Sequence, residues 1–124
     1  MNERINTILY KQTKIIYLNF NGLNNTTQEN EKEFISNIEI AIQFIVTNGK
    51  DSLVLSDLRD ISLNETISKK IKELKAKIKK DCKKSAVVCT KKKIHFLYRL
   101  LNFCNLCPCF AFKTPEAAKE WLIK

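Results

Sequence analysis

The chain has few of the residues that interrupt regular structure, with 2 Gly and 2 Pro among its 124 residues. Phosphate-binding loops of the glycine-rich kind need several glycines close together, so this scarcity argues against them. No uninterrupted apolar run is long enough to span a bilayer, and Met1–Asn6 lacks the apolar segment of a signal peptide. We therefore expect a cytoplasmic protein whose 5 cysteines are reduced thiols.

Hydrophobic residues make up 44% of the chain and charged residues 28%, which is typical of a globular protein. This composition excludes a disordered tail, a collagen-like chain and a coiled-coil rod. The length suits a single domain that covers residues 1–124.

Positive charge is concentrated in the second half of the chain. Residues 1–64 carry 6 basic and 8 acidic side chains (net −2), whereas residues 65–124 carry 16 basic and 5 acidic ones (net +11). Such a field attracts nucleic acid, anionic membranes or acidic proteins. However, 19 of the 22 basic residues are Lys, and base or phosphate recognition favours the Arg fork, so nucleic acid is the least favoured partner. The excess of Lys, Asn and Ile also fits an AT-biased genome, with no function for the lysines.

Hydrophobic patterning predicts a hairpin at the start of the chain. Residues 5–10 and 14–20 are two apolar runs, and alternation in the second one indicates a strand nearer the core. Thr26 and Glu29 have capping-box spacing, and five apolar residues then follow on one helical face: Phe34, Ile38, Ala41, Ile42 and Ile45. Residues 52–57 form a short apolar run that is typical of a buried central strand.

The second half alternates helices and strands in the same way. We expect a helix over 65–80 with an apolar stripe of Ile67, Ile71, Leu74 and Ile78, a strand over 85–89, a third helix over 92–103 and a strand over 109–112. Thr114 and Pro115 favour the start of a last helix, as N-cap and first helical residue. The order β-β-α-β-α-β-α-β-α predicts an α/β domain with a mixed, mostly parallel sheet and an antiparallel edge.

This order and several local segments resemble the STAS-like domain family, which includes bacterial anti-sigma-factor antagonists and SpoIIAA-like proteins. The similarity covers about residues 14–124. Its segments are residues 15–22, 53–59, 86–88 and above all 112–122, where Phe, Thr-Pro-Glu, Ala and Trp-Leu recur as in small STAS-like proteins. The resemblance implies a single STAS-like domain that acts as a non-enzymatic regulatory module without a cofactor.

The family's phosphorylation switch has no direct counterpart in this sequence. In the antagonists an Asp-Ser-Ser-Gly string opens the helix after the central strand, and a partner kinase phosphorylates one serine. Here that stretch is Asn64-Glu65-Thr66-Ile67-Ser68. Thr66 or Ser68 is the possible phosphoacceptor, since phosphate suits a helix N-terminus. In the alternative, Asn64 is an N-cap and the other two are ordinary first-turn residues.

The loop after the central strand is the first candidate site. Asp57, Arg59 and Asp60 follow the carboxyl end of that strand, where open α/β sheets bind ligands, and STAS-like domains present this loop to partners. We therefore predict a protein-partner surface at Asp57, Arg59, Asp60, Ser62, Asn64 and Thr66. The alternative is structural, with Asp57 capping the turn and Arg59 paired with Asp60.

A lipid or anionic membrane surface is the first alternative partner. It would contact a basic face within residues 69–93, formed by Lys69, Lys72, Lys79, Lys80, Lys83 and Lys84, together with the third helix. That helix is apolar on more than one side, which favours self-association or a hydrophobic ligand.

Three closely spaced cysteines give the last alternative, a small metal- or thiol-dependent protein. Cys104, Cys107 and Cys109 could bind a soft metal, but tetrahedral zinc usually needs two separated pairs of ligands. A redox pair usually opens a helix, whereas this cluster follows one. Burial as small apolar side chains is the favoured interpretation, and we expect no metal.

Overall fold

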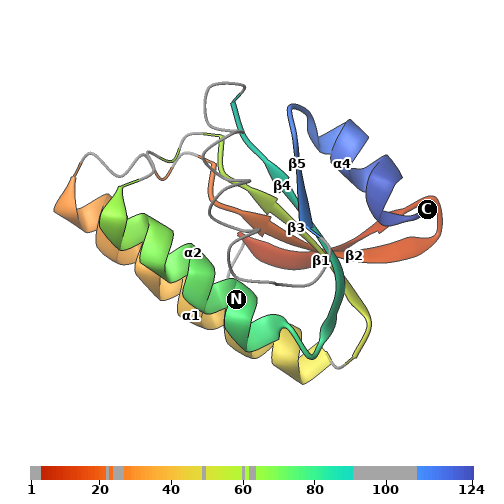
Figure 1. Ribbon diagram of the computed structural model, residues 1–124, viewed down its shortest axis with the longest axis horizontal. Helices are drawn as coiled ribbons and strands as arrows, with labels where there is room; N and C mark the ends of the chain where they lie inside the picture. Colours follow the sequence, from red (N-terminus) through yellow and green to blue (C-terminus); the bar gives the residue numbers. More distant parts are fainter. Residues whose placement is uncertain are drawn as a thin grey trace.

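Five strands form one sheet in the computed structural model, which describes residues 4–21, 23, 27–48, 50–59, 61, 64–90 and 109–124 (Figure 1). In these residues the sheet order equals the chain order. The strands are β1 (Ile5–Tyr10), β2 (Thr13–Asn19), β3 (Ser52–Asp57), β4 (Cys82–Val88) and β5 (Cys109–Phe112). β1 pairs antiparallel with β2, and every further pairing is parallel. This confirms the mixed sheet with an antiparallel edge.

Three helices pack on the sheet within the same residues: α1 (Gln28–Asn48), α2 (Glu65–Ile78) and α4 (Pro115–Leu122). Figure 1 shows α1 and α2 side by side on one face and α4 on the other. The predicted α/β architecture is therefore confirmed. The third helix expected at 92–103 lies outside the described residues.

Helix starts follow the predicted capping chemistry, with one shift. Thr114 Oγ1 accepts from the backbone N–H of Ala117 at 3.2 Å, with Pro115 at the first helical position as predicted. At α1 the predicted Thr26 lies outside the described residues, and Thr27 provides a cap instead, because its Oγ1 accepts from the N–H of Asn30 at 3.2 Å.

Two apolar clusters lie on opposite faces of the sheet, because side chains alternate along each strand. The larger one joins the sheet to α1 and α2 and contains every apolar residue predicted for the two helical stripes: Phe34, Ile38, Ala41, Ile42, Ile45, Ile67, Ile71, Leu74 and Ile78. The smaller one joins the other face to α4 through Ile15, Leu55, Ala86, Val88, Ala118 and Leu122. The central strand β3 is thus buried on both faces.

β4 begins earlier than the sequence pattern predicts. The expected strand covered residues 85–89, whereas β4 is Cys82–Val88 and α2 already ends at Ile78. Lys83 and Lys84 therefore belong to a strand. Pairing with β3, from Ser52↔Cys82 and Leu53↔Lys84 onward, supplies backbone hydrogen bonds that hydrophobic periodicity does not reveal.

Candidate functional site

The carboxyl end of β3 holds a buried ion pair. Asp57, whose side chain is 1% exposed, accepts from Arg59 through Nε at 3.0 Å (Oδ1) and Nη2 at 2.7 Å (Oδ2). The backbone N–H of Arg59 also donates to Asp57 Oδ1 at 3.2 Å, which closes a turn. The side chain of Arg59 is 39% exposed.

Tyr17 completes this network from the neighbouring strand β2. Its hydroxyl donates to Asp57 Oδ2 at 3.2 Å. Burial raises the pKa of Tyr17 first of all, and the negative charge of Asp57 and the hydrogen bond to it raise that pKa further. Asp57 is therefore engaged by two side chains and is not free to act as a general base.

Asp57 caps the turn, as the structural alternative for this loop predicts. Arg59 pairs with Asp57. Asp60 lies outside the described residues, so its pairing with Arg59 stays a prediction. A guanidinium two residues away can fold back and bind the carboxylate bidentately. The carboxylate that is buried at the strand end needs such a counter-charge.

The first turn of α2 follows the same loop. Asn64 Oδ1 accepts from the N–H of Ile67 at 2.8 Å, which confirms Asn64 as the N-cap. Thr66 is exposed on this turn, whereas Ser68 is 9% exposed and faces the core. Of the two candidate phosphoacceptors, only Thr66 lies at the surface. Ser62 lies outside the described residues.

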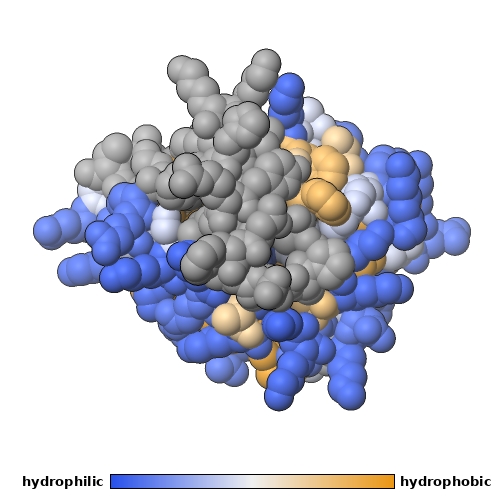
Figure 2. Space-filling view, in the orientation of Figure 1, coloured by the Kyte–Doolittle hydropathy of each residue, from blue (hydrophilic) through white to orange (hydrophobic). Residues whose placement is uncertain are grey.

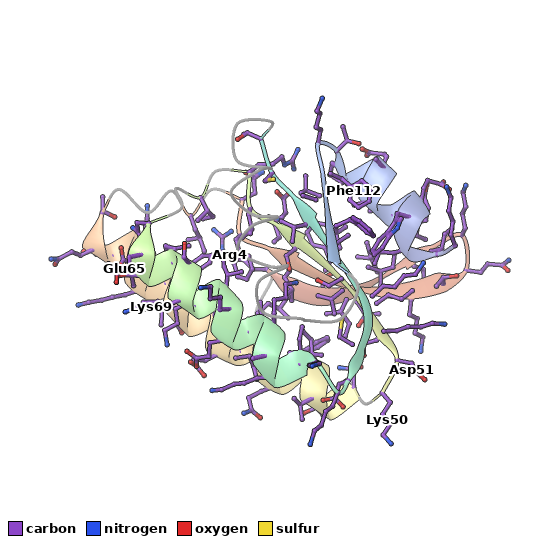
Figure 3. The ribbon with its side chains drawn as sticks, in the orientation of Figure 1. Arg4, Lys50, Asp51, Glu65, Lys69 and Phe112 are labelled. Atoms are coloured by element: carbon purple, nitrogen blue, oxygen red, sulfur yellow. The ribbon has the colours of Figure 1, made fainter. Side chains whose placement is uncertain are left out.

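The lysines predicted as one basic face lie on two sides of the sheet. Four of them are exposed: Lys69 in α2, Lys79 and Lys80 just after it, and Lys83 at the start of β4. Lys72 of α2 is half-buried. Figure 3 places Lys69 near one end of the helical layer, and Lys50 with Asp51 at the other. Blue side chains cover the helical layer at the lower left of Figure 2.

Acidic residues neutralise part of this charge. Glu73 pairs with Lys70 at 3.3 Å and with Lys77 at 3.0 Å, and these contacts lower the pKa of Glu73, the hydrogen bond from Lys77 being the largest cause. Glu39 of α1 lies 3.6 Å from Lys70. Acidic residues of α2 itself and of α1 thus compensate part of the positive charge of α2.

Lys84 is separated from the other lysines because it packs against α4. Its Nζ donates to the carbonyl oxygens of Trp121 at 3.1 Å and Lys124 at 3.0 Å, and lies 4.8 Å from the centre of the Trp121 ring. The ammonium therefore binds the carbonyl end of α4, where a helix carries partial negative charge. Its role is to hold α4 on the sheet.

Sequence reasoning missed Lys75, which is 1% exposed. It projects from α2 toward the sheet, where its Nζ donates to Ser85 Oγ of β4. One signal was present in the sequence: Ser68 and Lys75 stand seven residues apart, each directly after a residue of the apolar stripe, Ile67 and Leu74. Two turns of helix place them on the same side of that stripe.

The cysteine prediction falls mainly outside the described residues. Cys104 and Cys107 lie there, and Cys109 is the first residue of β5. Cys82 and Cys89 are buried. Within the described ranges no group of three or more His, Cys, Asp or Glu side chains could hold a metal ion. No helix in those ranges has the length and apolar character needed to cross a membrane.

Comparison of the whole fold with solved structures finds an uncharacterised protein of the DUF3478 family from Shewanella loihica PV-4, described as having a SpoIIAA-like fold. The TM-score is 0.63, and the match covers 95% of this chain and 91% of that one. This chain has a SpoIIAA-like fold. At 16% sequence identity the likeness concerns the fold alone.

No protein-family model matches the sequence, and no curated protein matches it. The SpoIIAA-like fold confirms the resemblance inferred from the strand and helix order and from residues 112–122. Activity and partners must therefore be argued from the side chains of this chain.

Proposed function

We propose that this chain is a non-enzymatic regulatory module that binds a protein partner through the loop between β3 and α2. The observation that carries the proposal is the Asp57–Arg59 pair, which fixes the first turn of that loop to the sheet. A turn that is already held in place loses little entropy on binding, which favours recognition.

The same geometry favours binding over catalysis. A general base needs a carboxylate that can accept a proton from a substrate, but both oxygens of Asp57 already accept from Arg59. The exposed Thr66 offers a hydroxyl on the partner side of the loop.

A photo-crosslinking residue in place of Thr66 tests the proposal directly. The matched control carries the same residue in place of Lys77, which is exposed near the other end of α2. In cell extract we expect a discrete crosslinked protein from position 66 and none from position 77. An excess of unlabelled wild-type protein should compete, whereas an excess of Thr66→Lys should not. Equal crosslinking at both positions, or no competition, would refute the loop as a partner surface.

The first alternative is an anionic membrane or lipid surface. Lys79, Lys80 and Lys83 support it, because they are exposed and make no ion pair with the described part of the chain. They lie where α2 ends and β4 begins, far along the helix from Thr66. Vesicle flotation at low and high salt distinguishes the two functions, because surface electrostatic binding weakens steeply with salt.

A further inference from the structure

The Lys75–Ser85 contact places an ammonium group inside the larger apolar cluster. Lys75 is 1% exposed and Ser85 is 0% exposed, and Lys75 Nζ donates to the hydroxyl oxygen of Ser85. Ser85 pairs in register with Val54, and Ile71 and Leu74 lie on the same side of α2. A charge in such surroundings is costly unless an opposite charge accompanies it.

No carboxylate of the described residues pairs with Lys75. Asp57, the buried acidic residue of the described chain, points to the other face of the sheet, since it is bonded to Tyr17 and stands in register with Val88 of the smaller cluster. Residues 91–108 contain no Asp or Glu, and the acidic residues outside the described chain are Glu3 and Asp60. The hydroxyl of Ser85 is a dipole and compensates the ammonium only in part.

Two further buried hydroxyls face the same layer without hydrogen-bond partners, Ser56 Oγ and Ser68 Oγ. Ser56 lies two residues beyond Val54 on β3 and so shares a sheet face with Ser85. Ser68 lies two turns before Lys75 on α2. Because α2 connects parallel strands, it runs opposite to them, and Ser68 and Ser56 are both displaced from the Lys75–Ser85 contact toward the carboxyl end of the sheet. We call Ser56, Ser68, Lys75 and Ser85 the buried polar stripe.

We propose that the buried polar stripe binds the carboxylate of a small organic acid with an apolar body. The carboxylate would accept from Lys75 Nζ and from the hydroxyls that now lack partners. One ammonium favours a singly charged ligand over a phosphate dianion. Val54, Val87, Ile71 and Leu74 of the same cluster are aliphatic, so they would contact an aliphatic or aromatic body that local opening admits. This site is separate from the β3–α2 loop surface, so either proposal can fail without the other.

Thermal unfolding with matched eight-carbon probes tests the site. Lys75 is closed to solvent, so a ligand enters by local opening and the protein is incubated with each probe before melting. Saturating octanoate should raise the Tm of the wild-type protein by several degrees, because it binds the folded state alone. Octanol and octylamine, which have the same chain without the negative charge, should not. Equal Tm rises with octanoate and octanol would overturn the carboxylate site.

Two variants assign the effect to the stripe. Lys75→Met keeps the length of the side chain and removes its charge, so we expect it to fold and to lose the octanoate shift. Lys79 is an exposed lysine of the same region, and the Lys79→Met variant should keep the octanoate shift. Ser85→Ala retains the ammonium and serves if Lys75→Met does not fold; its octanoate affinity should fall several-fold. An undiminished shift in either stripe variant would overturn the proposal.

Discussion

Lys83 and Lys84 are neighbours on β4 but have different surroundings. Lys83 is exposed, whereas Lys84 Nζ donates to two carbonyl oxygens at the end of α4 and lies over the Trp121 ring. Lys83 is the extra residue at a register shift, because Ser52 pairs with Cys82 and Leu53 with Lys84, and Lys84 lies on the sheet face that α4 covers. Of these two adjacent lysines, Lys83 therefore contributes charge to the surface, whereas Lys84 stabilises the packing of α4 on the sheet.

Lys84→Met should lower the free energy of unfolding by about 1–2 kcal/mol, because hydrogen bonds from a charged donor and a cation at a helix C-terminus are lost. Lys83→Met is the matched control and should change it by no more than about 0.5 kcal/mol. Urea denaturation followed by Trp121 fluorescence measures both. Equal effects of the two substitutions would contradict the role assigned to Lys84.

Tyr17 makes stability depend on pH in the alkaline range. Its pKa is raised in the folded state by burial, the charge of Asp57 and their hydrogen bond. Below the ordinary tyrosine value near 10 both states are protonated and the contribution is complete. Above it the unfolded chain ionises first, so stability falls with rising pH. In the Tyr17→Phe variant the free energy of unfolding should fall less steeply between pH 10 and pH 11 than in the wild-type protein. An unchanged slope would rule out Tyr17 as the cause.

At the scale of elements, the β1–β2 hairpin closes through an unfavourable pair of turn residues. Lys11 and Gln12 have φ of 50° and 70°, the left-handed region that favours Gly and Asn. Lys11 is also tied to α4, with its Nζ 2.5 Å from Glu120 Oε1, and Tyr10 donates to the same oxygen. The contact with α4 helps this turn persist without glycine.

Gln12→Gly should therefore stabilise the protein, by about 0.5–1 kcal/mol, because glycine adopts positive φ without a steric cost. The same substitution at the exposed Gln43 inside α1 should destabilise it by about 1 kcal/mol, since there glycine only adds chain entropy. Denaturant unfolding of the two variants gives opposite signs if the turn geometry is correct. A loss of stability in both would contradict it.

The elements that periodicity predicted are those whose apolar residues alone decide packing. The stripes of α1 and α2 are buried as expected, and so is β3. The helix caps Thr114 and Asn64 were also predicted, but two other features that depend on polar partners were missed. Lys75 counts as polar in any hydrophobic pattern, yet Ser85 across the layer allows its burial. Likewise, the partner of Arg59 depends on how a two-residue turn folds back, which spacing does not determine.

At the scale of the whole molecule, net charge and charge placement make different predictions. The chain carries a formal charge of +9, which should attract it to anionic vesicles at low salt. However, Lys70 and Lys77 both pair with Glu73, whereas Lys79 and Lys80 are exposed beyond the end of α2 without ion pairs in the described chain. If the placement of charge governs binding to anionic vesicles, the pair Lys79 and Lys80 should contribute more to it than the pair Lys70 and Lys77.

Two double variants with equal charge changes separate the possibilities. Lys79→Gln with Lys80→Gln should weaken flotation with anionic vesicles at low salt several-fold, because two unpaired charges are lost. Lys70→Gln with Lys77→Gln should weaken it less, since those charges are already partly compensated by Glu73. Both should lose flotation at high salt, where the Debye length falls to about 3 Å at 1 M. Equal weakening would mean that net charge alone governs the attraction, and the lysines after α2 would then form no distinct surface.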